Sequence, residues 1–486
     1  MPGSPFDPVP VRDFTATPAL PHQGGGASEV KRDGGALPIA ANLRVVALWC
    51  ERGLALGLVL LPPLLAMVPH GAAPLAGFAG LCAAGLLIAT GRLRQGGLRQ
   101  PAALLLALLL WGALSTAWSI VPGWSLILDL RLAGLAAAAL ALIAAVPRIA
   151  APWRLGLCLI IGTALGAALA LGDLATAGGL SRTVSVRAFT AARLNQLAAW
   201  LAILALPASA FVFGCGRRVA ALLLFAGMAA AVAALDGTGA KMALALSLPA
   251  AGLFFWRRRW TARIAAVIAA AAILTAPLTL PRLASLPGVF ATADAFKDSA
   301  GHRLLIWSFA GDRIAERPFV GWGLDAARAI PGGSDEIRPA QNWLPLHPHD
   351  AALQVWLELG APGAALFALL AALLWLRLAA AAWPRLYAAA AGGSCAAAFA
   401  IALEGWGIWQ EWWLATLALA LFAVLVMARA AQAGLRNRIP RGSRDPLVRI
   451  PDGSTVGPGF RRECEGLEYR PAIPPRRPRG WRDGGR

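Results

Sequence analysis

Long apolar runs alternate with short polar connections along most of the 486-residue chain. Each run has about the 20 residues that an α-helix needs to cross a hydrocarbon layer of about 30 Å, at about 1.5 Å per residue. The pattern predicts about twelve membrane-spanning helices, near residues 46–69, 74–90, 101–120, 125–146, 155–172, 194–214, 218–236, 240–256, 262–280, 350–376, 385–404 and 411–428. We therefore expect an all-α, polytopic membrane protein.

The stretches outside these runs predict the rest of the organisation. Residues 1–40 are rich in Pro and Gly and read as a disordered leader. A first membrane block of about nine helices would span 45–280, a large and partly helical polar loop 281–349, and a last block of about three helices 350–428. Residues 429–486 form a basic tail, which we expect to be disordered and to lie on anionic lipid head groups.

Composition agrees with a membrane protein and argues against other classes. Hydrophobic residues make up 58% of the chain and charged residues 14%, and the mean hydropathy is +0.62, far from the usual soluble balance. The formal charge of +19 falls mostly in short connections and in the tail, so membrane orientation explains it better than nucleic-acid binding. The six cysteines are scattered without a Cys-x-x-Cys pair, which predicts neither a disulfide framework nor a zinc site.

The basic residues also predict the orientation. Alternate connections hold arginine clusters, and because such clusters stay in the cytoplasm, both termini are expected there; the clusters are Arg92, Arg94 and Arg99; Arg148 and Arg154; Arg217 and Arg218; Arg257 to Arg259 and Arg263; and Arg377 and Arg385. The polar loop 281–349 would then face outward, into the periplasm of a Gram-negative cell, from the inner membrane.

Residues 299–363 gather the side chains best suited to chemistry, including three of the five histidines. Pro348 suits the first position of a helix, which would place His349 in the first turn of the following span. There the helix dipole lowers the affinity of an imidazole for a proton and attracts anions. His349 is therefore a candidate general base, or else an interfacial residue that caps the span, and His347 could bind substrate beside it or could only cap.

Several cations lie on the predicted outer side, against the usual charge rule, and an anionic ligand would explain them. Arg187 and Arg193 lie in the connection 173–193, and Lys241 in the turn 236–241. Arg303 should open a short helix that ends before Pro318, with Trp307 one turn later. Each of these cations could instead be an interfacial side chain that reaches toward water.

Other interpretations of the same loop remain open. His347, His349 and Asp350 resemble metal ligands that Asp294, Asp298 or Asp312 could complete, although no further His or Cys closes a tetrahedron. Glu358 lies half a turn round the helix from His349, so we expect a buried carboxylate that pairs with an arginine or a backbone group and locks the loop. No Gly-x-Ser-x-Gly elbow or P-loop is present.

Two motifs in this region resemble those of the O-antigen ligases and related polymerases. The first is Arg-x-x-x-Trp followed by Pro and Gly-x-Gly, here Arg303, Trp307, Pro318, Gly321 and Gly323. The second is a His-Asn-like pair that runs into Leu-Gln-x-x-x-Glu-x-Gly-x-x-Gly, here His349, Asp350, Leu353, Gln354, Glu358, Gly360 and Gly363. Asp350 stands where the family more often has Asn.

The resemblance implies a membrane glycosyltransferase that needs neither a metal, a nucleotide nor another cofactor. It would move a polysaccharide from an undecaprenyl-pyrophosphate carrier to a sugar hydroxyl of lipid A-core, with His349 as general base and Arg303 on the pyrophosphate. Arg187 or Arg193 would match a functional arginine of the family, and Lys241 stands where many members have Arg. The same motifs fit a polymerase, whose acceptor is another lipid-linked glycan, and the same cations could serve a transporter of lipid-linked or anionic polysaccharide intermediates.

Overall fold

The computed structural model describes residues 36–91, 96–184, 190–437, 448–449 and 455–456. It divides into two compact units, Met1–Asn42 and Leu43–Arg486. Most of the predicted leader lies outside the described residues, but its last residues from Ala36 already belong to the first helix. The architecture below is that of the second unit.

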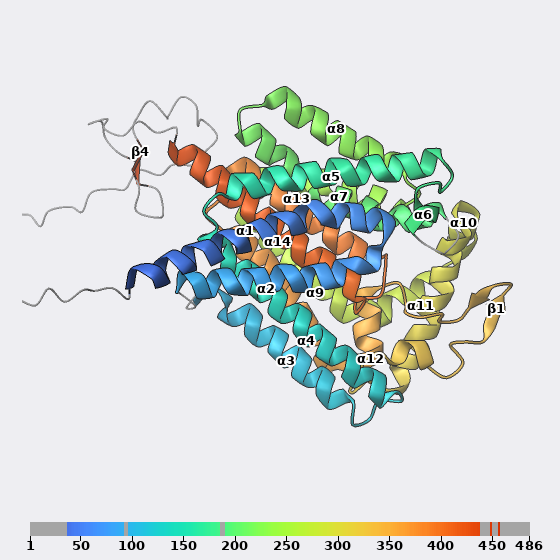
Figure 1. Cartoon of the computed structure of the whole chain (residues 1–486). Coiled ribbons are helices and arrows are strands. Elements are labelled where there is room, and N and C mark those ends of the chain that lie inside the picture. The colour runs from blue at the N-terminus through green and yellow to red at the C-terminus, as the bar shows by residue number, and fades with distance from the viewer. Residues whose placement is uncertain (1–35, 92–95, 185–189, 438–447, 450–454, 457–486) are drawn as a thin grey trace, which may run out of the picture. The chain divides into compact units, whose positions relative to one another are not determined.

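Helices make up most of the residues that the structure describes (Figure 1). The long ones are α1 (Ala36–Met67), α2 (Ala72–Thr90), α3 (Arg99–Ser115), α4 (Pro122–Ala145), α5 (Pro152–Ala175), α7 (Asn195–Gly214), α8 (Arg218–Ala234), α9 (Thr238–Ser285), α11 (Asp298–Glu316), α12 (Ala351–Ala380), α13 (Arg385–Ala402) and α14 (Glu411–Asn437). The short ones are η1 (Pro69–Gly71), η2 (Gly96–Leu98), η3 (Val146–Arg148), α6 (Ser181–Val184), η4 (Ala191–Leu194), α10 (Val289–Phe296) and η5 (Ala326–Ala329). Two small antiparallel pairs complete the described chain, β1 (Glu336–Arg338) with β2 (Gln341–Asn342), and β3 (Val448–Arg449) with β4 (Thr455–Val456).

The all-α, polytopic character predicted from the apolar runs is confirmed. Nine helices of the described chain are long and apolar enough to cross a membrane, rather than the twelve predicted. Two of the predicted spans correspond to shorter apolar helices, α3 and α8, and two others fall within the 48 residues of α9. The last helix, α14, continues to Asn437, beyond the predicted end at 428.

Helix α9 covers two predicted spans because its axis turns at Arg257. The backbone of Arg257 is not helical, with φ −135° and ψ 53°. Across this break the hydroxyl of Thr261 donates to the carbonyl of Leu253 at 3.0 Å, whereas eight residues of straight helix would separate them by about 12 Å. The chain therefore folds back at Arg257, and each arm runs beside other helices of the bundle.

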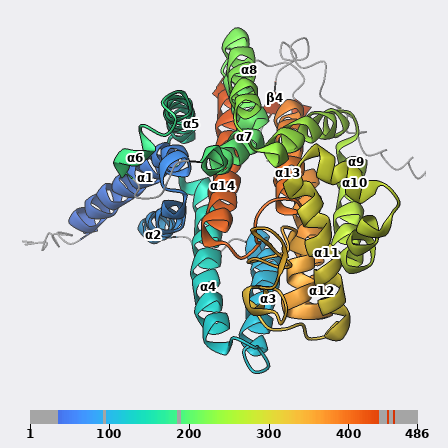
Figure 2. The same cartoon turned by 90° about the vertical axis from the view of Figure 1, so that its right-hand side faces the viewer.

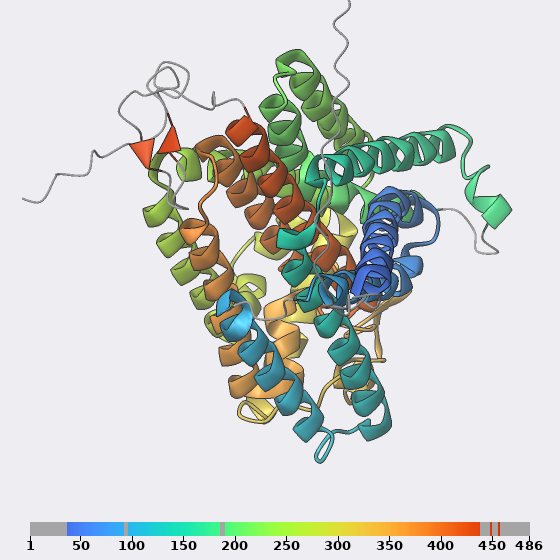
Figure 3. The ribbon, with the colours of Figure 1, turned by 60° about the vertical axis from the view of Figure 1, so that its left-hand side comes forward.

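The two arms of α9 pack against α12 and α13 (Figure 2). Glycines make the contact with α13 close, since a methyl group on Gly392 would come within 2.5 Å of the Phe254 ring and one on Gly393 within 2.6 Å of the Ser247 carbonyl. Small residues at helix contacts are typical of packing in membranes, where the backbones must approach closely. On the other flank of α12 lies α3, the light-blue helix beside the orange one in Figure 3.

Contacts between connections show that the bundle has two chemically different ends. At one end, Arg377 donates to the Gly97 carbonyl, Arg258 to the Leu378 carbonyl, and Arg429 to the carbonyl of Val146. These connections are among the arginine-rich ones predicted to be cytoplasmic. At the other end, which we call the site end, Ile120 contacts Trp322, Lys297 contacts Asp236, and Arg303 contacts Glu404.

The polar loop 281–349 lies at the site end and is partly helical. Helix α11 begins at Asp298, five residues before Arg303. The prediction that Arg303 opens this helix is therefore wrong. The helix ends at Glu316, before Pro318, as predicted. The β1–β2 hairpin and η5 complete the loop before α12 begins.

Candidate active site

The chain enters α12 through a sharp turn rather than through a helical His349. Asp350 is the N-cap: its side chain accepts the Leu353 N–H at 2.7 Å, and the helix begins at Ala351. The prediction that Pro348 opens the helix is therefore wrong, because an aspartate can satisfy an unpaired N–H of the first turn and Pro cannot. His349 lies before the helix, with a left-handed backbone (φ 57°) that is costly for a residue other than glycine.

This turn brings the two histidines together. Their ring centroids are 4.3 Å apart, and the backbone N–H of His349 donates to Nδ1 of His347 at 3.2 Å. Nδ1 of His349 lies 2.8 Å from the carbonyl oxygen of Gly405. Because a carbonyl can only accept, Nδ1 carries the proton, and Nε2 of His349 is left as an unprotonated acceptor.

Burial keeps both imidazoles neutral. It lowers the pKa of His349 to about 4, although the bond to the Gly405 carbonyl opposes the shift and the Arg303 charge adds to it. Burial also lowers the pKa of His347 to about 3, with further contributions from His349, Arg303 and Arg328. At neutral pH His349 therefore presents a free lone pair to the site.

Helix α11 supplies the side chains that hold this turn. Trp307 donates its indole N–H to the Pro348 carbonyl at 3.0 Å. One turn earlier, the Arg303 guanidinium forms an ion pair with Glu404, which is only partly exposed. Since Glu404 precedes the residue whose carbonyl binds His349, a single short segment positions both Arg303 and the imidazole.

Glu404 also contacts the first turn of α9, where Lys241 lies. A methyl group on Gly239 would collide with the Glu404 carboxylate, so the carboxylate lies against the N-terminus of α9, where the helix dipole favours negative charge. Lys241 itself is exposed. Beside this turn, Lys297 approaches Asp236 at 3.8 Å and the Thr238 hydroxyl at 3.4 Å, which adds a cation that the sequence analysis did not select.

Of the two arginines predicted in the connection 173–193, the structure describes only Arg193. Arg187 lies outside the described residues. Arg193 belongs to η4, directly before α7. The side chain of Asn195 approaches the turn that contains Lys241, since a methyl group on Gly237 would lie 3.1 Å from its amide oxygen. The structure thus brings the start of α7 and the start of α9 to the site end.

The two sequence motifs pack directly on each other. Helix α12 breaks at Gly360 (φ 63°), and the carbonyls freed there accept bonds from elsewhere: Leu357 from the Trp322 N–H and Glu358 from the Gly323 N–H, both at 2.9 Å. Gly321 (φ 67°) has no room for a side chain, because a methyl group would overlap the Glu358 carbonyl. The Gly-x-Gly segment therefore satisfies the backbone of the broken helix.

Glu358 locks this contact, as predicted. Its fully buried carboxylate accepts the Asp325 N–H at 2.6 Å, the Gln354 amide at 3.0 Å and the Trp409 indole N–H at 2.8 Å. Its partners are a backbone group and uncharged side chains, and no arginine contacts it among the described residues.

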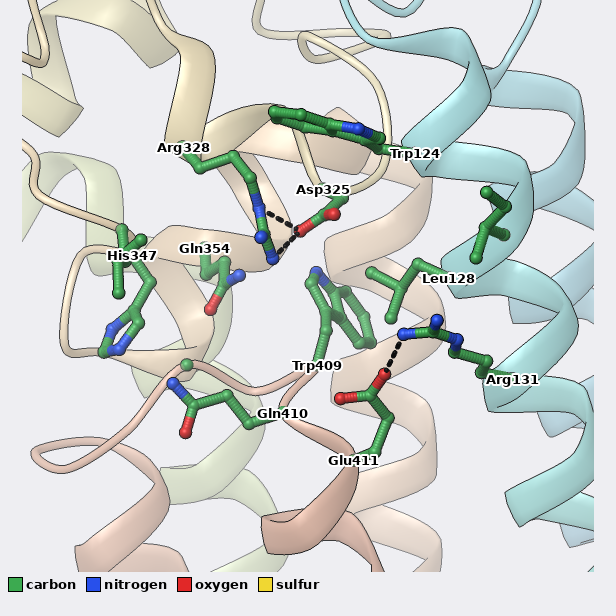
Figure 4. Close-up of a pocket in the computed structure, with 13 residues that line it drawn as sticks. Trp124, Leu128, Arg131, Asp325, Arg328, His347, Gln354, Trp409, Gln410 and Glu411 are labelled. Carbon is green, nitrogen blue, oxygen red and sulfur yellow. Dashed lines mark hydrogen bonds and ion pairs between the residues drawn. The ribbon is translucent and has the colours of Figure 1, made fainter. Parts of the chain in front are cut away.

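A cavity of about 370 Å³ opens beside His347 (Figure 4). Two ion pairs border it, Arg328 with Asp325 at 2.7 Å and Arg131 with Glu411 at 3.0 Å. None of these residues was predicted from the sequence. They come from three separate stretches of the chain, and only the unusual position of Arg131 within an apolar helix and of Glu411 at the start of another could have drawn attention to them.

The residues proposed as metal ligands have other partners. Asp294 and Asp298 both contact Arg338, at 2.8 and 3.2 Å, and His347 and His349 contact each other and the backbone. Within the described residues no group of three or more His, Cys, Asp or Glu side chains is placed to hold a metal ion.

The sequence is similar to a known family and to named proteins. The profile of the family described as O-antigen ligase matches residues 222–368, which include Lys241, Arg303 and the histidine pair. A provisionally named polysaccharide ligase of Rickettsia conorii is 27% identical over 230 residues, 46% of this chain and 53% of the relative. One of Rickettsia prowazekii is 33% identical over 124 residues (25% and 30%), and one of Rickettsia bellii 26% over 270 residues (54% and 65%). The chain thus spans about half the length of the first of these relatives, and the resemblance found in the two motifs is confirmed.

Proposed function

Starting from the similarity to O-antigen ligases, we propose that this protein is a membrane glycosyltransferase of the polysaccharide ligase type. It takes a polysaccharide from an undecaprenyl-pyrophosphate carrier and transfers it to a sugar hydroxyl of lipid A-core. The observation that carries the proposal is the neutral His349, whose Nε2 can accept a proton and whose Nδ1 is held by the residue that follows Glu404, the partner of Arg303.

His349 acts as the general base. The acceptor hydroxyl donates its proton to Nε2 while its oxygen attacks the anomeric carbon of the donor sugar, and the bond to the pyrophosphate breaks with its electron pair. The Gly405 carbonyl, which accepts a hydrogen bond from the Nδ1–H group, stabilises the imidazolium that forms. Trp307 and Asp350 hold the turn from either side, and His347 keeps the backbone of His349 in place.

Arg303 binds the leaving pyrophosphate. One of its N–H groups is engaged by Glu404, and the remaining donors of the planar guanidinium suit phosphate oxygens. Lys241 at the start of α9 and Arg193 directly before α7 add positive charge, and Arg187, which lies outside the described residues, is a further candidate cation. An anion bound here also raises the pKa of His349, because negative charge favours the imidazolium, and so makes it a stronger base when the donor is present.

The protein lies in the inner membrane, its site end faces the periplasm, and both termini lie in the cytoplasm. The arginine-rich connections that meet at the other end support this orientation under the positive-inside rule. A polymerase would use the same residues, with the end of another lipid-linked glycan as acceptor, and a transporter would bind the anion without a reaction.

The test is to delete the gene in its host and to compare extracted lipopolysaccharide on a gel after complementation. Wild-type protein should restore the long glycan ladder, and His349→Ala should not, with equal amounts of both in the membrane. His302→Ala is the matched control, because this histidine of the same loop bonds the Asn342 carbonyl (2.8 Å), and it should restore the ladder.

The gel also separates the alternatives. Glycan that accumulates on the carrier while the core stays bare indicates a ligase, and single repeat units on the core indicate a polymerase. Full activity of His349→Ala would refute the role of the imidazole and favour transport, and an unchanged ladder in the deletion strain would refute the proposed substrate.

A further inference from the structure

The cavity beside His347 lies apart from Arg303 and its neighbouring cations. It is bordered by the first part of α4, by η5 and its preceding turn, and by the connection that leads into α14 (Figure 4). His347 is the member of the histidine pair that lines it. The charges of Arg303 on one side and Arg328 on the other both act on this imidazole, which places His347 between the two regions.

The charge of the cavity differs from that of the Arg303 region. Its two arginines are each paired with a carboxylate, Arg328 with Asp325 and Arg131 with Glu411, and His347 is neutral because burial lowers its pKa to about 3. The formal charge of the lining is therefore zero. Such a cavity suits an uncharged polar ligand and offers no excess charge for a pyrophosphate.

The lining also combines flat aromatic surface with hydrogen-bonding groups. The ring of Trp124 is half exposed and carries the Arg328 guanidinium at 5.6 Å from its centroid. Gln410 uses its carbonyl oxygen to accept the Trp412 N–H, and its amide N–H groups make no bond to the described residues. A sugar ring presents an apolar C–H face and a rim of hydroxyl groups, and this lining matches both.

We propose that this cavity binds a terminal sugar ring of the acceptor glycan. The inference rests on the proposed function and adds to it a second subsite, separate from the pyrophosphate region. A volume of about 370 Å³ falls near the lower end of small-molecule sites, which fits a short part of a glycan. Because the rings of His347 and His349 are 4.3 Å apart, a sugar that contacts His347 in the cavity lies close to the base.

The rest of a membrane-bound acceptor needs a way out of the cavity. A second cavity, of about 430 Å³, shares Arg131 and Glu411 with the first and continues between α2 and α4. Its other lining residues are mostly small or apolar, among them Gly77, Gly134 and Leu135. It therefore adjoins the sugar subsite at the Arg131–Glu411 pair and offers a less polar surface to the part of the acceptor beyond the terminal sugar.

The experiment uses full-length protein in lipid nanodiscs and the variants Trp124→Ala, Trp124→Phe and Trp153→Ala. Trp153 is the matched control, because it is 54% exposed where Trp124 is 52%, and it carries Arg154 at 5.4 Å. The probes are rough lipopolysaccharide of the deletion strain and its released core oligosaccharide. Steady-state transfer gives the KM for acceptor and for donor, and titration calorimetry gives the Kd for the oligosaccharide.

Trp124→Ala should raise the KM for acceptor and the Kd for oligosaccharide roughly tenfold and leave the KM for donor unchanged. Trp124→Phe should recover part of the loss, and Trp153→Ala should match wild type. Equal constants for all variants, or a rise in the KM for donor instead, would overturn this inference while transfer by the wild type upheld the proposed function. If the wild type transfers nothing but binds the oligosaccharide through Trp124, the proposed function fails and the sugar site stands; if it neither transfers nor binds, both are refuted.

Discussion

Replacing Asp350 with asparagine should remove a pH-dependent loss of stability. Asp350 is 4% exposed and caps α12 through the Leu353 N–H. Burial raises its pKa from 3.8 to about 7, although bonds from the Leu353 and Ala352 N–H groups oppose the shift. Asparagine is an equally good N-cap and does not titrate, so Asp350→Asn retains the cap and removes the ionisation.

The sign and size of the effect follow from this shift. Because the folded state holds the proton more tightly than the unfolded state, the stabilisation from Asp350 is complete below pH 3.8 and is lost as the pH rises to about 7. A pKa raised from 3.8 to about 7 corresponds to about 4 kcal/mol in the free energy of unfolding. Roughly 2 to 3 kcal/mol of this falls between about pH 5 and about pH 8.

The assay is thermal unfolding of the protein in nanodiscs between about pH 5 and about pH 8. The advantage of Asp350→Asn over wild type should grow steadily as the pH rises. Asp350→Ala is the control. Its free energy of unfolding should lie about 1 kcal/mol below that of Asp350→Asn at every pH because the cap is gone, and its pH dependence should follow that of the asparagine variant. Parallel curves for wild type and Asp350→Asn would show that Asp350 ionises normally and would refute the reasoning.

Three further predictions concern the reaction and the motif contact. The acid limb of kcat should lie at higher pH than that of kcat/KM, because the pKa of His349 is about 4 in the free protein and a bound pyrophosphate raises it; coincident limbs would contradict an anion beside the imidazole. Arg303→Lys should raise the KM for donor roughly tenfold, since it keeps the charge and loses the guanidinium fork, and an unchanged KM would place the pyrophosphate elsewhere. Gly321→Ala should cost roughly 3 kcal/mol or more in unfolding experiments, whereas Gly288→Ala should cost only about 1 kcal/mol, because its φ is also positive (77°) but nothing lies within 4 Å; equal costs would mean that backbone strain alone explains both.

The apolar pattern predicted the helical architecture well because hydrocarbon length and helix rise leave little freedom. It also predicted that the chain turns between residues 256 and 262, and the structure places this turn at the non-helical residue Arg257. It also placed the start of α12 too early: both Pro348 and Asp350 are common at helix starts, and the choice depends on a bond that forms only in the folded chain.

The site was predicted where its residues form short motifs and missed where they meet across the chain. Arg303, Trp307 and the histidine pair were selected and lie together. Glu404, which pairs with Arg303 from 101 positions away, was not selected, although a carboxylate at the end of an apolar span could have suggested a partner. The residues that line the cavity beside His347 are still farther apart in the sequence, and only the fold brings them together.

The contact between Gly321 and the break in α12 has a consequence for how the protein is made. Gly360 lies nine residues along α12, about 13 Å from its first turn along the helix axis. The loop segment that contains Gly321 must therefore reach that depth. The carbonyls there would be left without donors in lipid until Trp322, Gly323 and the Trp111 indole of α3 arrive. Insertion of α12 and docking of the loop must therefore occur as one event during biogenesis, and a loop expressed alone would lack the surface on which it folds.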